Sequence, residues 1–272
     1  MGILGCLAGC GGALSHRSVA EFEQGATLPS GKTAIRIEIE NGTVGVATAS
    51  TRDVRIAGGV RRAADTAAML ATLEAVPLRF ATVEDPANPE TLVLEGPHLP
   101  AGAVGVLGLE LGVHLPADVP LTVIIRGSGH VTMADRLAPS RVKTARGDLR
   151  FERCAGGVHA RTGRGNVIAF EHRGDVDIHT AVGDMQVFVH QPGGLVRLVT
   201  GQGTIQCHLP QDTSFDVDAR VEIGRIGNGF GLLAERVGDF GAALVGRQGA
   251  GTTKVVLRTG SGHLSLTPRR FD

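Results

Sequence analysis

Glycine recurs at a nearly fixed spacing through the second half of the chain. Successive members of this series are 18 residues apart at first and 20 or 21 apart further on. One early copy precedes the series, and an irregular gap comes before the last copy. The glycines are Gly42, Gly129, Gly147, Gly165, Gly183, Gly203, Gly224 and Gly262. A short period of this kind predicts a repeat architecture, in which each unit packs against its neighbours.

Apolar residues alternate with polar ones on both sides of each glycine. In the unit of Gly183, Val176 and Ile178 precede the glycine, and Met185 and Val187 follow it. Alternation with a period of two is typical of strands that have one buried face. The glycine between the two runs allows a positive φ angle that other residues resist. Each unit is therefore predicted to be a strand, a tight turn and a second strand.

The equal period and the equal residue types at equal positions favour a β-solenoid built from parallel coils of about 18 residues. The alternative is a β-sandwich of hairpins, which also gives regular short strands. Threonine lies three positions before the glycine in five units, and we expect its hydroxyl groups to hydrogen-bond from coil to coil. One short helix is predicted over residues 61–75, where alanine and leucine fall near helical spacing.

These patterns divide the chain into segments. Residues 1–10 are predicted to be a lipoprotein-type signal, and residues 11–32 a polar tether. Residues 33–268 are predicted to form the β-strand repeat domain. Its irregular N-terminal part covers residues 33–118, and its regular repeats cover residues 119–268.

The predicted signal depends on a short motif at the N-terminus. The sequence Leu7-Ala8-Gly9-Cys10 matches the bacterial lipobox, which predicts a diacylglycerol on Cys10 and a lipid-anchored protein of the cell envelope, outside the cytoplasm. No lysine or arginine precedes Cys10, although secretory signals begin with a charged segment. The alternative is a cytoplasmic protein whose N-terminus is not a signal.

The composition argues against several classes of function. The 27 basic and 27 acidic residues cancel, so no overall positive charge draws the protein to nucleic acid. Tryptophan and tyrosine are absent, which argues against base-stacking platforms and against sugar sites lined by these rings. No apolar run reaches about 18 residues, the length expected of a membrane-spanning helix.

Groups that could catalyse a reaction or bind a metal do not gather at one position of the repeat. Asp175 and Asp177 lie close together, but the same positions in the neighbouring units hold no carboxylate, so a glycan-cleaving pair is not predicted. His172 and His190 share a position in successive units, but a metal site needs three or four ligands. We expect both side chains to be exposed in turns, and we predict no catalytic residue, metal or cofactor.

Basic residues recur four positions before the glycine, and in two units also one position before it. They predict a basic stripe along the repeat, which consists of Lys143, Arg146, Arg161, Arg164, Arg220 and Arg258. Such a stripe can bind an anionic polymer or lipid headgroups. It can also be a solvated face whose charges keep sheets from pairing with other chains.

The copies of Val-x-Val-x-Thr-x-x-Gly-Asp-Val, the segment Ile35 to Val46, the alanine-rich helix and the segment Leu257 to Leu266 resemble the bacterial putative-adhesin family of β-strand repeats. This domain of unknown function is related to head domains with a Gly-Ile-Asn motif. The resemblance covers about Thr33 to Leu266. It implies an all-β, solenoid-like fold on the outer side of a membrane, with no established catalytic residue.

We therefore expect a non-enzymatic, adhesin-like protein of the cell envelope that presents a repetitive surface to a partner. The expected partner is an envelope protein or an anionic polymer, with the membrane reached through the lipid anchor and no contact with nucleic acid. One alternative is a glycan-active β-helix enzyme. The other is a self-assembling scaffold whose repeats stack end to end.

Overall fold

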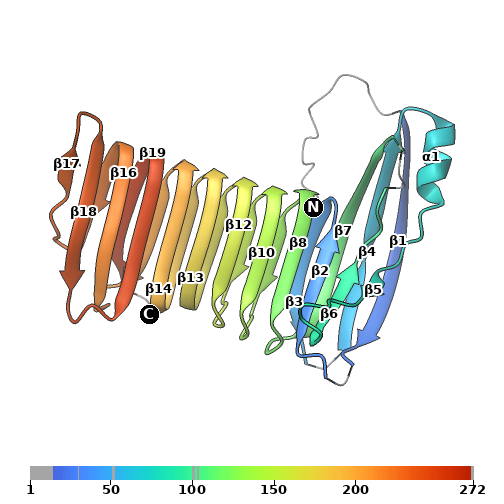
Figure 1. The fold of residues 1–272 in the computed structure, drawn as a ribbon, viewed down its shortest axis with the longest axis horizontal. Helices are drawn as coiled ribbons and strands as arrows, with labels where there is room; N and C mark the ends of the chain where they lie inside the picture. The colour runs from blue at the N-terminus through green and yellow to red at the C-terminus, as the bar shows by residue number, and fades with distance from the viewer. Residues whose placement is uncertain (1–14, 30, 51–52, 100–101, 103, 271–272) are drawn as a thin grey trace.

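The computed structural model describes residues 15–29, 31–50, 53–99, 102 and 104–270. These residues form nineteen strands and one short helix, which confirms the predicted all-β class (Figure 1). The first elements are β1 (His16–Thr27), β2 (Ala34–Ile39), β3 (Gly42–Ala49), β4 (Asp53–Ala64), α1 (Ala67–Glu74), β5 (Ala81–Val83), β6 (Thr91–Glu95) and β7 (Val106–Pro116). The next are β8 (Leu121–Ser128), β9 (Val131–Ala134), β10 (Ser140–Arg146), β11 (Leu149–Glu152), β12 (Val158–Arg164), β13 (Val167–Val182) and β14 (Met185–Gln202). The last are β15 (Ile205–Pro210), β16 (Phe215–Asn228), β17 (Glu235–Val237), β18 (Gly241–Gln248) and β19 (Thr253–Arg269).

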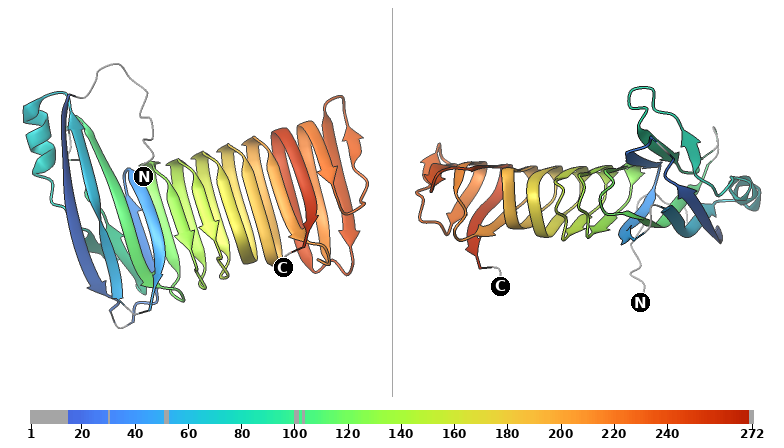
Figure 2. Two further views of the ribbon diagram at one scale, coloured as in Figure 1. Left: turned by 180° about the vertical axis from the view of Figure 1, so that it is seen from behind. Right: turned by 90° about the horizontal axis from the view of Figure 1, so that it is seen from below.

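The strands before and after the glycine turns form two layers of an elongated molecule, visible in the right-hand view of Figure 2. We call them the upstream layer, which contains β2, β8, β10 and β12, and the downstream layer, which contains β3, β9 and β11. Long strands such as β13 and β14 pass from one layer into the other. Neighbouring units pair in parallel and in register, so Val158 lies opposite Val176, and Val176 lies opposite Val196. Equivalent residues of successive units therefore stack on one another.

The core lies between the two layers and consists of the alternating apolar side chains. Val176, Ile178 and Val187 are completely buried, whereas Asp177 and Gln186, which are next to them in the chain, are only half-buried and face outward. The same alternation continues through β19, where Val255 and Leu257 are buried. Within the described residues, no helix combines the length and the apolar character needed to cross a membrane.

The eight glycines of the repeat form a single stack along one edge, which we call the glycine edge. A methyl group added to Gly165 would lie 2.1 Å from the carbonyl oxygen of Gly147, and one added to Gly183 would lie 2.0 Å from that of Gly165. Seven of the eight have φ angles between +142° and +152°. Their order in the stack is Gly42, Gly129, Gly147, Gly165, Gly183, Gly203, Gly262 and Gly224.

This order follows the sequence except at the C-terminal end, where Gly262 comes before Gly224. The unit of Gly42 packs against that of Gly129, because β2 pairs with β8 and β3 pairs with β9. The unit of Gly262 lies between those of Gly203 and Gly224, because β19 pairs with β14 and β15 on one side and with β16 on the other. The last strand of the repeat is therefore inserted between two earlier ones.

The threonines beside the glycine edge stack as expected, but their hydroxyl groups do not bond to one another. Thr162 Oγ1 lies 3.2 Å from the carbonyl oxygen of Gly147, and Thr200 Oγ1 lies 3.1 Å from that of Gly183. Each hydroxyl thus faces a backbone carbonyl of the neighbouring unit.

The N-terminal end differs from the sequence prediction in two places. Residues 16–27 belong to the predicted tether, but they form β1, which pairs antiparallel with β4. β1 lacks a continuous apolar face because it is an edge strand, and Val19 is 70% exposed. The helix begins at Ala67 rather than at residue 61, with Thr66 as its N-cap. Residues 61–64 continue β4, in which Val60, Arg62 and Ala64 are buried at alternate positions.

The edge opposite the glycines contains buried polar side chains, one of which, His172, was expected to be exposed in a turn. His172 is completely buried, and its Nε2 lies 3.0 Å from the carbonyl oxygen of Asp175. Burial lowers the pKa of His172 to about 4, so the ring is neutral at physiological pH. His172 lies opposite Val189 rather than His190, because the register shifts at this turn. Arg136, in the corresponding position two units earlier, is also completely buried.

The other end of the molecule carries an antiparallel extension. β16 pairs with β18, and β18 pairs with β17. The Phe230 ring covers the end of the core, with its centroid 5.0 Å from that of Phe215. Leu233 and Phe240, beyond this cover, are 86% and 72% exposed.

Candidate functional site

The outward side chains of the upstream layer form two straight rows, because the pairing is parallel and in register. The first outward row consists of Arg36, Thr122, Arg141, His159, Asp177 and Arg197. The second outward row consists of Glu38, Ile124, Lys143, Arg161, His179 and Val199, and it continues through Arg258 and Arg220. Neighbouring strands in such a layer are about 4.8 Å apart, so each row presents a side chain at that interval.

Three basic side chains meet in the middle of this face. Lys143 lies opposite Arg161, and Arg141 lies in the first row beside Lys143, two residues along β10. All three side chains are exposed. Within the described residues, no carboxylate forms an ion pair with any of them. We call Arg141, Lys143 and Arg161 the basic cluster.

Arg126, Arg220 and Arg258, on the same face, are each paired with carboxylates. Arg126 forms ion pairs with Glu38 and Glu40, at 2.7 Å and 3.3 Å. Arg220 and Arg258 both bind Asp218. The hydrogen bond from Arg258 holds the pKa of Asp218 below its usual value, so this carboxylate stays charged at neutral pH. The contrast makes the basic cluster a local excess of positive charge in a protein of zero net charge.

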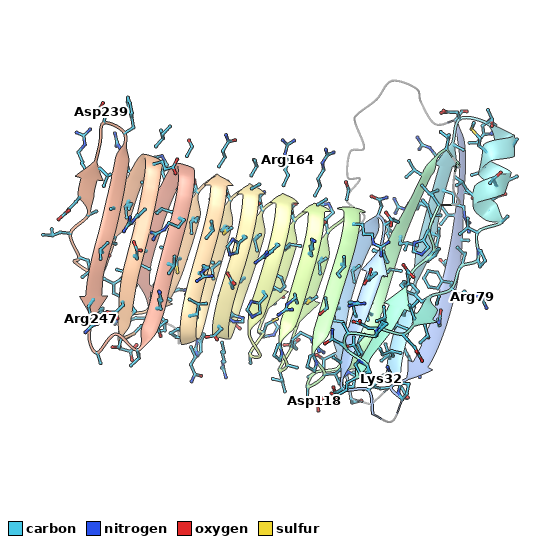
Figure 3. All side chains as sticks on the ribbon, viewed as in Figure 1. Lys32, Arg79, Asp118, Arg164, Asp239 and Arg247 are labelled. Atoms are coloured by element: carbon cyan, nitrogen blue, oxygen red, sulfur yellow. The ribbon has the colours of Figure 1, made fainter. Side chains whose placement is uncertain are left out.

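The structure therefore divides the predicted basic stripe into three parts. Lys143 and Arg161 belong to the basic cluster, and Arg220 and Arg258 are held by Asp218. Arg146 lies opposite Arg164 at the ends of β10 and β12. Figure 3 shows Arg164 projecting away from the glycine edge rather than from the face of the layer. These two arginines extend the positive charge around the edge.

Next to the basic cluster, two histidines approach one carboxylate. His179 Nε2 lies 2.9 Å from Asp177 Oδ1, and His159 Nδ1 lies 3.7 Å from Asp177 Oδ2. Asp175 has a different role, because its Oδ1 accepts a hydrogen bond from the backbone nitrogen of Leu195. The two aspartates noted in the sequence thus make separate contacts. In the part of the chain that the structure describes, no group of three histidine, cysteine, aspartate or glutamate side chains is arranged to hold a metal ion.

A groove of about 460 Å³ continues the first outward row toward the N-terminal end. Arg36, Thr122, Arg141 and His159 lie along its floor, and the turn after β5 forms a wall. In that turn Asp85 binds Arg36, with Arg36 Nη1 2.8 Å from Asp85 Oδ2. Arg141 and His159 therefore belong both to the groove and to the row that leads to Asp177.

Four residues of the site, Arg36, Arg141, His159 and Arg197, were not predicted from the sequence, although a signal for them was present. All four lie six positions before the glycine of their unit. Like Lys143, they lie an even number of positions before the glycine, on the outward side of the strand. Asp85 carried no such signal, because it lies in an irregular turn outside the repeat.

The predicted lipidation site, Cys10, lies outside the described residues. No family model matches the chain, and no curated protein matches it.

Two solved structures are similar to this chain over most of its length. One is a putative cell adhesion protein from Clostridium sporogenes, with 12% identity, 93% of this chain and 100% of that chain covered, and a TM-score of 0.38. The other is a putative adhesin from Bacteroides fragilis, with 11% identity, 91% of this chain and 97% of that chain covered, and a TM-score of 0.43.

Proposed function

We propose that this chain is a non-catalytic, adhesin-like β-solenoid of the cell envelope that binds an extended anionic polymer across its upstream layer. The observation that carries the proposal is the basic cluster. Arg141, Lys143 and Arg161 form an exposed group of positive charges without a paired carboxylate among the described residues, although most other charges on this face are paired. Positive charge that is not used within the fold is available to a ligand.

The repeating geometry supports a polymer rather than a small anion. The rows present side chains every 4.8 Å or so over several strands. A ligand with regularly spaced negative charges can therefore contact several side chains at once, and many weak contacts add to a useful affinity. Each exposed contact alone contributes little, because water and salt screen it.

The two alternatives receive less support from the described residues. An enzyme that cleaves glycans needs two carboxylates free to act as acid and base, but Asp218 is held by arginines and Asp177 is in contact with two histidines. A scaffold of stacked repeats needs an open end of the core. Phe230 and Leu232 instead cover the core at the end formed by β16.

Reversal of the cluster charges tests the proposal. The variant Lys143→Glu/Arg161→Glu should lower the affinity for polygalacturonate and for long-chain polyphosphate at least tenfold at low salt. Raising the salt from 50 to about 300 mM should weaken wild-type binding in the same direction, because mobile ions screen exposed charges. Biolayer interferometry with immobilised polymer measures both effects.

The matched control is Arg173→Glu/Arg225→Glu, which changes the net charge equally at exposed positions outside the two outward rows. This control should retain most of the affinity. Equal losses in the two variants would show that only net charge matters, and would contradict a site at the basic cluster. Binding of wild-type protein to anionic vesicles, but to neither soluble polymer, would also contradict it.

We also propose that Cys10 attaches the protein to the membrane, on the basis of Leu7-Ala8-Gly9-Cys10. Mass spectrometry of protein purified from its native membrane should find an N-terminal Cys10 that carries a diacylglycerol, with the first nine residues removed. The variant Cys10→Ser should leave the protein unlipidated. An unmodified peptide that starts at Met1 in the native protein would refute the anchor.

A further inference from the structure

We infer that the groove at the N-terminal end of the first outward row binds an acidic sugar residue, so that the anionic polymer of the proposed function is an acidic polysaccharide. This inference rests on the proposed function and gives its ligand a chemical class. The groove and the basic cluster share Arg141, so one chain of sugars can occupy both.

The size of the groove suits a sugar. Its volume of about 460 Å³ lies within the range of roughly 300–1,000 Å³ that is usual for small-molecule sites. One wall contains the apolar side chains of Pro120 and Pro139, and Ile124 also lines the groove. A sugar ring has C–H groups that can pack on such a wall while its hydroxyl groups reach polar side chains.

The charges in the groove select a ligand that has both an anionic group and hydroxyl groups. Arg141 is exposed, and a carboxylate can bind its guanidinium group through two parallel hydrogen bonds. On the other side of Thr122, Arg36 is already bound to Asp85 and Glu38. The anionic end of a ligand is therefore directed toward Arg141 and His159, not toward Arg36.

The turn that forms the wall can recognise hydroxyl groups. Asp85 is fixed there by Arg36, by the backbone nitrogen of Ala87 and by the side chain of Asn88. A carboxylate of this kind accepts hydrogen bonds from hydroxyl groups, and Asn88 and Thr122 can donate to them. A phosphate chain without hydroxyl groups would place negative oxygens beside Asp85, which is unfavourable. This combination therefore favours an acidic sugar over a polyphosphate.

A pair of variants separates the groove from the basic cluster. The groove variant Thr122→Val/Asn88→Ala removes hydrogen-bonding groups and changes no charge. It should lower the affinity for short uronate oligosaccharides about tenfold, because it removes two groups that can hydrogen-bond to sugar hydroxyls. The same variant should leave polyphosphate affinity unchanged. The cluster variant Lys143→Glu/Arg161→Glu should weaken binding of both ligands.

The probes are tetramers of galacturonate, glucuronate and mannuronate, a neutral galactose tetramer, and polyphosphate, all measured by isothermal titration calorimetry with folding checked by circular dichroism. At least one uronate tetramer should bind more tightly than the neutral tetramer. If no uronate tetramer binds more tightly, or if the groove variant binds the preferred uronate as well as wild type does, the groove inference is wrong. The proposed function then still stands if the cluster variant loses affinity for polymer, and it fails if wild type binds no anionic polymer.

Discussion

Replacement of Gly165 by alanine should destabilise the fold by roughly 3–6 kcal/mol, because two costs add at this position. The φ angle of Gly165 is +152°, a conformation that residues with a Cβ atom rarely adopt. The new methyl group would also lie 2.1 Å from the carbonyl oxygen of Gly147, far inside contact distance. Neither atom can move without shifting the stacked turns on both sides. Urea-induced unfolding, followed by circular dichroism, should show the loss.

The matched control is Gly108→Ala in β7. Gly108 has no positive φ angle, and nothing lies within 4 Å of a methyl group added there. This variant should unfold within about 0.5 kcal/mol of wild type. If Gly165→Ala proved as stable as Gly108→Ala, the close stacking of the glycine edge would be refuted.

Replacement of Arg136 by methionine should cost roughly 3 kcal/mol, since it leaves two buried carbonyl groups without their donors. The Arg136 side chain is completely buried, and its two terminal nitrogens donate to the carbonyl oxygens of Pro116 and Val119. Burial lowers the pKa of its guanidinium, which nonetheless keeps its proton at neutral pH. Through these hydrogen bonds, Arg136 holds the loop between β7 and β8 against the turn after β9.

Thermal and urea unfolding of three variants measure this role. Arg136→Lys retains one donor group and should lose less stability than Arg136→Met. Arg173→Met removes an exposed arginine from the same edge and should be close to neutral. A buried charge can be replaced by an apolar side chain without loss in some proteins. If Arg136→Met were as stable as wild type, this protein would also tolerate the replacement, and the stabilising role of the Arg136 hydrogen bonds would be contradicted.

The repeat itself was predictable from local sequence. Alternating apolar residues and a glycine at a constant offset determine which side chains are buried and where the chain turns, and Val176, Ile178 and Gly183 have the predicted roles. These features depend on the neighbouring residues of one unit, so the sequence of that unit is enough to identify them.

Features that depend on distant segments were not predictable in the same way. β1 is a strand because β4 offers it a free edge, not because its own sequence has a clear apolar face. Arg136 is completely buried, and its partners Pro116 and Val119 lie 20 and 17 residues earlier in the chain. His172 is completely buried as well. The groove needs the turn at Asp85 to fold beside β8 and β10, which lie more than 30 residues further along the chain.

The position of β19 has a consequence for the order in which the molecule assembles. β19 lies between β14 and β16, so β16 cannot take its final place directly on β14 as the chain is made. During synthesis, β16 and β18 therefore have two options. They can pair with each other while β16 has no partner on its other side, or β16 can pair with β14 first and be displaced from it when β19 is made. Folding therefore cannot proceed as simple growth from the N-terminal end, and the closing step is the entry of β19. We expect this step to be slow, because it joins residues 59 apart in the sequence, such as Leu195 and Lys254, and adds a strand to both layers at once.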